Sequence, residues 1–251
     1  MRDKTITTVQ KHYENHLAPI YVWMAGGFDT ALLRAERDVD VVSNQSGRGL
    51  NAVDLGSGFG VHAIALARQG YSVIAMDTSS LLLDVVRPNI GTLPIRLIQD
   101  DLLEFPQYIE SQVALVLCMG DTLTHLSTKS MVEELFHSVS VALQAGGKFI
   151  ATFRDYTLPL TDERRFVPVK NDDDRILTCF LEYSDEHVTV NDVLYEREAS
   201  VWNLRVSAYK KLRLSREWVV LMLKDLGFFV FVEPGEAGLL RVVATKLGSN
   251  N

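Results

Sequence analysis

The chain has 251 residues, and 47% of them are hydrophobic, which is enough for the core of one large domain or of one domain with an insertion. Its 25 basic and 32 acidic residues give a net charge of −7 without a basic stripe, which argues against nucleic acid as a partner. No apolar run approaches a membrane span, residues 1–16 lack the apolar segment of a signal peptide, and the two cysteines fit reduced thiols. We therefore expect a cytoplasmic protein with no membrane partner.

The N-terminal part of the chain, residues 1–46, is predicted to be helical, because Tyr13, Leu17 and Tyr21 recur at helical spacing. Strand and helix patterns then alternate, which is typical of right-handed crossovers and a doubly wound, mostly parallel α/β sheet. Strands are expected at 50–55, 73–76, 95–98, 114–119 and 148–153, and helices at 61–69, 81–86 and 128–143.

The pattern changes between residues 157 and 214. Strands at 176–183, 188–195 and 200–209 follow one another with polar turns and no helix between them, which predicts an antiparallel sheet. A helix from Ser215 to Leu226 and a hairpin of strands 228–232 and 240–245 return the chain to the first sheet. We therefore expect an N-terminal helical cap (1–46), a core (47–156 and 215–251) and an inserted antiparallel subdomain (157–214) that covers the substrate.

Glycines at alternate positions follow the first core strand. Glycine permits the torsions of a tight turn and lets a ligand approach the main chain closely. Asp54 lies at the end of that strand and Asp77 at the end of the next, where an acid can bind both hydroxyls of a ribose. The sequence thus predicts a site for a small molecule that carries a nucleoside.

The segment Asp54-Leu-Gly56-Ser-Gly58-Phe-Gly60 resembles motif I of the class I S-adenosylmethionine-dependent methyltransferases, roughly D-x-G-x-G-x-G. The dinucleotide fingerprint G-x-G-x-x-G has a different spacing, although a nicotinamide-dependent oxidoreductase stays open as an alternative. The resemblance implies a Rossmann-like sheet of seven strands that ends antiparallel. It also implies S-adenosylmethionine as the cofactor and S-adenosylhomocysteine as its product.

The same resemblance assigns further cofactor contacts. Residues 99–106 are similar to the family segment whose acid accepts a hydrogen bond from the adenine amino group; this acid matches Asp101, with Asp100 as the alternative. An aromatic residue of the N-terminal helix would close over the cofactor, and we assign it to Tyr21, with Tyr13 and Trp23 as alternatives. The expected cofactor residues are Tyr21, Asp54, Gly56, Gly58, Gly60, Asp77, Thr78, Asp101, Leu102, Met119 and Gly120.

The segment from Cys118 to Leu126 resembles L-G-N-S-F-A-H-L of glycine and sarcosine N-methyltransferases, and residues 153–156 resemble their H-R-N-Y. The resemblance implies that Arg154 holds a substrate carboxylate and that Asp121, His125 and Tyr156 surround the reaction centre. The chain departs from that group at Asp121, where the group has asparagine, and at Phe153. We predict N-methylation of a small carboxylate-bearing amine, which arrives neutral or gives its proton to Asp121 or His125.

Other functions stay open. A small-molecule O-methyltransferase and a non-catalytic S-adenosylmethionine-binding module would share motif I. No metal is expected, because His12 and His16, four residues apart, have no further ligands beside them. The sequence does not specify the oligomeric state.

Overall fold

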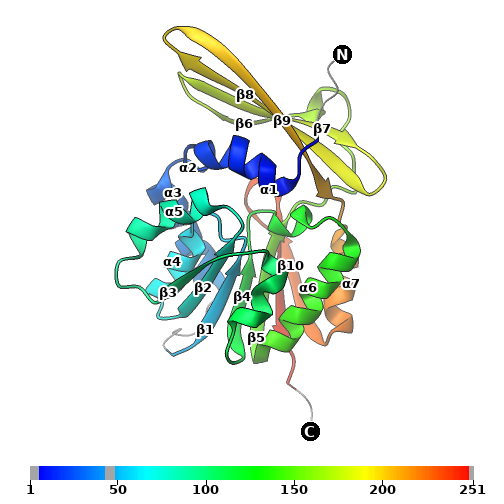
Figure 1. Cartoon of the computed structure of the whole chain (residues 1–251). Helices are drawn as coiled ribbons and strands as arrows, with labels where there is room; N and C mark the ends of the chain where they lie inside the picture. The colour runs from blue at the N-terminus through cyan, green and yellow to red at the C-terminus, as the bar shows by residue number, and fades with distance from the viewer. Residues whose placement is uncertain (1–5, 43–48, 249–251) are drawn as a thin grey trace.

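The computed structural model of the chain describes residues 6–42 and 49–248. Its strands form two separate sheets, one of seven strands and one of four. Figure 1 shows the smaller sheet above the larger one, with the N-terminal helices between them. This arrangement confirms the predicted α/β fold with an inserted antiparallel sheet.

The larger sheet has the strand order β10-β11-β5-β4-β1-β2-β3. Its strands β1 to β5 pair in parallel, because helical segments carry the chain back between them. The closing hairpin pairs antiparallel, with β11 beside β5. The bounds are β1 (Asn51–Leu55), β2 (Ser72–Asp77), β3 (Ile95–Gln99), β4 (Val113–Cys118), β5 (Leu143–Phe153), β10 (Phe228–Pro234) and β11 (Leu240–Lys246).

Helices cover both faces of this sheet. One hydrophobic cluster, around Phe136 and Phe149, contains residues of α6 (Lys129–Ala142) and α7 (Arg216–Asp225). The other, around Ile64, contains residues of α3 (Phe28–Val42), α4 (Val61–Arg68) and α5 (Ser80–Ile90). Ser215 caps α7 by accepting a hydrogen bond from the Trp218 backbone, as predicted. Among the described residues, no helix has the length and apolarity needed to cross a membrane.

The N-terminal segment is helical but irregular. It consists of α1 (Val9–His12), a π-helical turn (Tyr13–Leu17), a 3₁₀ turn (Ala18–Ile20) and α2 (Tyr21–Met24), and α3 follows. The predicted helical character is confirmed for these residues, whereas 1–5 and 43–46 lie outside the described residues. Leu17 and Ile20 pack against the inserted sheet, and the Thr7 backbone N–H donates to the Ala208 carbonyl (2.9 Å). The N-terminal segment is therefore attached to the smaller sheet.

The smaller sheet is antiparallel, in the order β6-β7-β8-β9. It comprises β6 (Phe166–Asn171), β7 (Arg175–Tyr183), β8 (His187–Glu198) and β9 (Val201–Leu212). The three predicted strands are present, and β6 is a fourth that the sequence pattern did not show, since it is an edge strand with mostly exposed side chains. Arg213 donates to the Tyr156 carbonyl (3.0 Å) and the Thr157 carbonyl (2.9 Å), which ties together the two ends of the insertion.

Candidate active site

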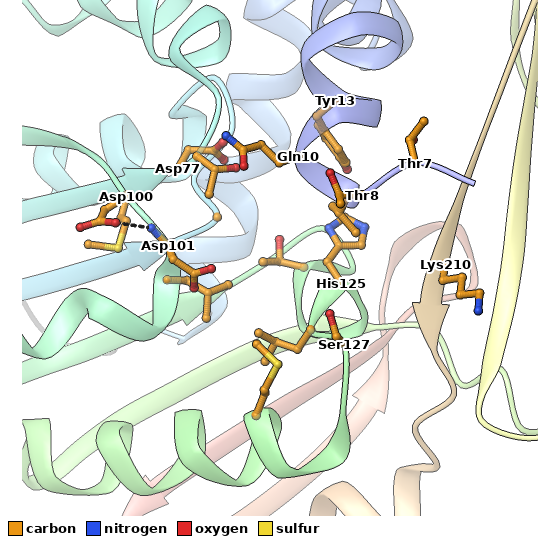
Figure 2. Close-up of a pocket in the computed structure, with 18 of the residues that line it drawn as sticks. Thr7, Thr8, Gln10, Tyr13, Asp77, Asp100, Asp101, His125, Ser127 and Lys210 are labelled. Carbon is orange, nitrogen blue, oxygen red and sulfur yellow. Dashed lines mark hydrogen bonds between the residues drawn. The ribbon is translucent and has the colours of Figure 1, made fainter. Parts of the chain in front are cut away.

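A cavity of about 440 Å³ lies at the carboxyl ends of the parallel strands. This is the edge at which open α/β sheets bind ligands. In Figure 2, Asp77 and Asp101 lie on one side of this cavity, and Tyr13 and His125 lie on the other. The inserted sheet contributes His187 and Lys210 to the lining, and the remaining lining residues are Ile6, Thr7, Thr8, Val9, Gln10, Gly56, Met76, Thr78, Asp100, Leu102, Thr122, Leu126, Ser127 and Met131.

The glycines of the motif I turn all have positive φ angles, but they serve different purposes. A Cβ atom on Gly56 would lie 2.4 Å from Thr122 Cγ2, and one on Gly60 would lie 2.0 Å from Val86 Cγ2. Gly58 has open space at its Cβ position, and its backbone N–H donates to Asp77 Oδ2 (2.8 Å). Gly56 and Gly60 are thus required by packing, whereas Gly58 leaves room beside the main chain.

The carboxyl groups of Asp77 and Asp54, near this turn, differ in exposure and in hydrogen bonding. The Asp77 carboxylate faces the cavity and also accepts a hydrogen bond from the Ser79 backbone (2.8 Å). The Asp54 side chain is buried, and its Oδ2 atom has no hydrogen-bond partner among the described residues. Burial raises the pKa of Asp54 to about 6. A buried carboxylate oxygen without a donor is suited to a cationic ligand group.

We expect Asp54→Asn to stabilise the ligand-free protein at pH 8 and to weaken S-adenosylmethionine binding. The pKa of about 6 lies above the ordinary 3.8, so the protonated form stabilises the fold below pH 4, and this contribution is lost as the pH rises through 6. A shift of roughly two units corresponds to roughly 3 kcal/mol. The difference in melting temperature between the variant and the wild type should be larger at pH 8 than at pH 4.5. If Asp54→Asn and the wild type melt at the same temperature at pH 8, the ionised Asp54 carboxylate does not destabilise the folded protein, which would contradict this prediction.

The two acids after β3 are distinguished by their partners. Asp100 accepts hydrogen bonds from the Tyr108 hydroxyl (2.6 Å) and from the Asp101 backbone (2.8 Å). The Tyr108 hydrogen bond lowers the pKa of Asp100. Asp101 accepts only at Oδ1, from the Leu103 backbone (2.9 Å), among the described residues. Asp101 thus retains acceptor capacity in the cavity, and we keep it as the proposed adenine contact, with Leu102 and Thr78 beside it in the lining.

Aromatic side chains of the N-terminal segment lie over the glycine turn. The Tyr13 ring lines the cavity and lies 5.8 Å from the Tyr21 ring, which in turn lies 5.8 Å from Phe59 (ring centroids). Tyr21, the residue predicted to close over the cofactor, therefore lies behind Tyr13. Tyr13 lines the cavity and has the better position for this role. Trp23 faces the inserted sheet instead, where it donates to Asp172 and lies beneath the guanidinium of Arg175.

Asp121 and Tyr156 contact each other, as expected. Both carboxylate oxygens of Asp121, however, already accept hydrogen bonds from the protein. Asp121 Oδ1 accepts from the Arg154 backbone (2.9 Å), and Oδ2 accepts from the Tyr156 hydroxyl (3.1 Å) and from Lys211 Nζ (2.5 Å). A carboxylate held by a buried ammonium is a poor proton acceptor. Met119 and Gly120 do not line the cavity of the described residues. Met119 is buried in the core, and the Gly120 backbone N–H donates to Thr152 Oγ1 (2.8 Å).

His125 is the predicted reaction-centre residue that the structure places in the cavity wall. Its ring lies edge-on to Tyr13 (5.4 Å) and Tyr209 (5.8 Å), and its buried Nε2 atom has no hydrogen-bond partner in the part of the chain that the structure describes. Burial, followed by the nearby Lys211 charge, lowers the pKa of His125 to about 3. The imidazole is therefore uncharged at physiological pH, and it can accept a hydrogen bond from a bound molecule but is too weak a base to hold a proton there.

Arg154 is not where the substrate-carboxylate hypothesis requires it. Its guanidinium donates to the Ala237 carbonyl (2.5 Å) in the turn between β10 and β11, and it does not line the cavity of the described residues. The left-handed Gly238 beside it leaves room for the guanidinium, since a Cβ there would lie 2.9 Å from Arg154 Nη1. Within the described structure, the buried cation near the expected reaction centre is Lys211, which the sequence analysis did not single out.

A second cluster of buried polar side chains, centred on His12, joins the N-terminal segment to the inserted sheet. His12 contacts Asp192 Oδ2 through Nε2 (2.8 Å) and Ser207 Oγ through Nδ1 (2.7 Å), and its ring stacks on Tyr209 (4.1 Å). Asp192 also accepts from the Cys179 thiol (2.8 Å), so Cys179 is a free thiol in a polar contact. Sequence spacing gave no signal for this contact, because its members come from three distant segments.

The comparisons with known proteins agree with this geometry. Residues 52–147 match the family model described as a methyltransferase domain, and this range contains the glycine turn, Asp77, Asp101 and His125. Residues 52–147, which lie within the predicted core, thus resemble a methyltransferase domain. No curated protein matches the chain in sequence.

Several solved methyltransferases share the fold over nearly the whole chain. The CcbJ methyltransferase from Streptomyces caelestis is 16% identical, with a TM-score of 0.75 over 95% of this chain and 99% of that chain. The amino pentose methyltransferase CalS10 from Micromonospora echinaspora, solved with S-adenosylmethionine bound, is 15% identical, with a TM-score of 0.72 over 98% and 100%. The sugar N-methyltransferase KedS8 from a Streptoalloteichus species is 12% identical, with a TM-score of 0.67 over 86% and 87%. The particular resemblance to glycine and sarcosine N-methyltransferases stays a prediction.

Proposed function

We propose that the protein is an S-adenosylmethionine-dependent methyltransferase that methylates the amine of a small molecule. The observation that carries this proposal is His125, an uncharged imidazole with an unpartnered buried Nε2, placed in the wall of the cavity that begins at the motif I turn. The Nε2 atom can accept a hydrogen bond from the N–H of an acceptor amine that arrives neutral, and this contact would orient the nitrogen lone pair towards the methyl group.

The residues at the other end of the cavity fit the cofactor. Asp77 offers a carboxylate for two ribose hydroxyls and Asp101 an acceptor for the adenine amino group. Asp54 does not line the cavity of the described residues, and its buried charge would act on the positively charged methionine end from behind the glycine turn. When bound, S-adenosylmethionine supplies a methyl group on a sulfonium, so the protein need not activate a leaving group. The protein's task is to align the acceptor and exclude water, and the segment that contains Thr8 and Tyr13 covers the cavity.

The outer end of the cavity favours a polar, uncharged acceptor body. Thr7, Thr8 and Ser127 supply hydroxyl groups on the side of the cavity away from Asp77 and Asp101, with Lys210 beyond them. Such groups bind hydroxyls by hydrogen bonds. The amino pentose and sugar N-methyltransferases that share the fold act on this kind of molecule. We therefore favour an amine on a hydroxylated scaffold, such as an amino sugar, over the carboxylate-bearing amine, since Arg154 would have to leave the Ala237 carbonyl to bind a carboxylate.

A panel of acceptors tests this proposal. Purified protein with S-adenosylmethionine should add one methyl mass to amino sugars but not to their hydroxyl analogues, as measured by mass spectrometry. Arg154→Ala should leave this activity largely unchanged. If amino acids are methylated and Arg154→Ala raises their KM, the carboxylate version is correct. Methylation of phenols alone would identify an O-methyltransferase.

A further inference from the structure

The His12 cluster consists of His12, Asp192, Ser207 and Cys179, and it is buried between the N-terminal segment and the inserted sheet. The His12 and Asp192 residues are 0% and 2% exposed. Both Asp192 oxygens accept hydrogen bonds, one from the Cys179 thiol and one from His12, so we assign the imidazole proton to Nε2. Nδ1 is then the acceptor for the Ser207 hydroxyl (2.7 Å). Both ring nitrogens thus have a partner, which fixes the orientation of the imidazole.

Stability alone does not explain a buried carboxylate at this junction. Apolar side chains of similar volume often give equal or greater stability, because a buried carboxylate loses its hydration. Apolar packing already joins the two elements, since Leu17 and Ile20 of the N-terminal segment pack on Leu177 and Leu194 of the inserted sheet. Hydrogen-bonded partners add a defined geometry to such packing. The His12 cluster therefore fits a role in setting where the N-terminal segment lies on the sheet.

Residues 7–13, which we call the covering segment, are attached to neighbouring positions of β9 near both ends. At the start, the Thr7 backbone N–H donates to the Ala208 carbonyl (2.9 Å). Near the end, His12 contacts Ser207, the residue before Ala208. The residues of the covering segment that line the cavity between and beside these attachments are Thr8, Val9, Gln10 and Tyr13 (Figure 2). The inserted sheet thus determines the position of this wall of the cavity.

The covering segment meets the core through a ring contact. Tyr13 lies edge-on to His125 (5.4 Å between ring centroids). Beyond their immediate chain neighbours, the hydrogen bonds from residues 6–24 to other described residues go to the inserted subdomain, at Ala208, Asp192, Ser207 and Asp172. Apolar contacts are non-directional, whereas hydrogen bonds require a defined geometry. The His12 cluster therefore supplies orientation that the contact with the core does not.

The cluster also lies directly behind the residue that we propose to orient the acceptor. The His12 ring stacks on Tyr209 (4.1 Å between ring centroids). Tyr209 lies edge-on to His125 (5.8 Å). His12 thus contacts one of the two rings that enclose His125, and it precedes the other, Tyr13, in the chain.

We propose that His12, held by Asp192, is a positioning residue that places the covering segment over the acceptor end of the cavity and so aligns the methyl acceptor. This role rests on the proposed function for the identity of the acceptor as an amine. Asp77 and Asp101 are carried by the core, so binding of S-adenosylmethionine depends less on the cluster than binding of the acceptor does.

His12→Phe tests the proposal, because it keeps a ring on Tyr209 and removes both hydrogen bonds. The kcat/KM for the acceptor should fall roughly 10- to 100-fold, the effect of misplacing groups that position a substrate. The dissociation constant of S-adenosylmethionine, from calorimetry, should change much less. Hydrogen exchange of the amides of residues 6–24 should become faster. An unchanged kcat/KM in His12→Phe would overturn the proposal.

The matched control is His16→Phe in the same segment. His16 is also a buried imidazole, but its Nε2 atom has no hydrogen-bond partner among the described residues. The substitution therefore breaks no hydrogen bond at that atom, and His16→Phe should keep the wild-type kcat/KM and the wild-type exchange of residues 6–24.

A second variant separates positioning from stability. His12→Phe leaves a buried carboxylate without its partner, so its melting temperature should fall. Removal of all three partners in His12→Phe/Asp192→Leu/Ser207→Ala should restore the melting temperature, because no buried carboxylate is left unpaired, while kcat/KM should stay low. Recovery of both quantities, or a kcat/KM that follows the melting temperature across the variants, would show that the cluster is merely structural and would overturn the proposal.

The kinetic measurements use whichever acceptor the wild type methylates. Methylation of hydroxyl compounds alone would refute the proposed N-methylation, and the same variants would still test His12 on that acceptor. Wild-type protein that methylates no acceptor, amine or hydroxyl, would contradict both the proposed function and the role of His12.

Discussion

His125→Phe should lower kcat for methylation of an amine by roughly tenfold, because the acceptor loses its hydrogen bond to the imidazole and such a bond contributes about 0.5–1.5 kcal/mol. Phenylalanine keeps a ring between Tyr13 and Tyr209, so the packing of the N-terminal segment is retained. The affinity for S-adenosylmethionine should change little, because the cofactor contacts lie on Asp77 and Asp101. Steady-state kinetics and calorimetry on the same preparations measure both quantities.

His137→Ala is the matched control, since His137 is exposed on α6 away from the cavity. It should have wild-type kinetics. Because burial lowers the pKa of His125 to about 3, the loss of kcat/KM on acidification should follow the acceptor's own ammonium and change with the acceptor. Near-normal kcat in His125→Phe would exclude His125 from orienting the acceptor amine.

Asp77→Ala should weaken S-adenosylmethionine binding about tenfold or more, through the loss of charge-assisted hydrogen bonds worth roughly 1.5–3 kcal/mol. The substitution also releases the Gly58 and Ser79 backbone donors, so it affects both the ligand contact and the turn that presents it. Burial raises the pKa of Asp77, so wild-type affinity should begin to fall at a higher pH than for an ordinary aspartate.

Asp84→Ala is the control for this substitution. Asp84 is exposed on α5 and pairs with Arg87, in the element that follows Asp77. Isothermal titration calorimetry should give the wild-type dissociation constant for Asp84→Ala and a weaker one for Asp77→Ala. Equal constants would remove Asp77 from the ribose site.

The parts of the fold that could be predicted from sequence are those fixed by local patterns. Alternation of apolar strands with helical segments specified the parallel core, and the acid-glycine turn specified where the cofactor site would lie. Side-chain alternation specified three strands of the insertion. β6 was missed because Pro168 and exposed side chains obscure the alternation of an edge strand.

The site could be predicted only where one segment carries the signal. His125 and Asp101 reach the cavity because each lies in the segment that follows a core strand, β4 for His125 and β3 for Asp101. Lys211 could not be found this way, since its partner Asp121 is 90 positions distant in sequence and the two meet only when β9 folds back over the core. Arg154 was expected to face a substrate because it follows β5, but the neighbouring hairpin provides the Ala237 carbonyl that binds it.

The most direct test of the account is a thermal-shift measurement of the wild-type protein with S-adenosylmethionine, S-adenosylhomocysteine and NADH. A ligand at a hundred times its dissociation constant adds about 2.7 kcal/mol of stability. Both adenosyl compounds should raise the melting temperature, and the rise should be reduced in Asp77→Ala, whereas NADH should have no effect. Stabilisation by NADH alone would contradict the account and indicate a nicotinamide site.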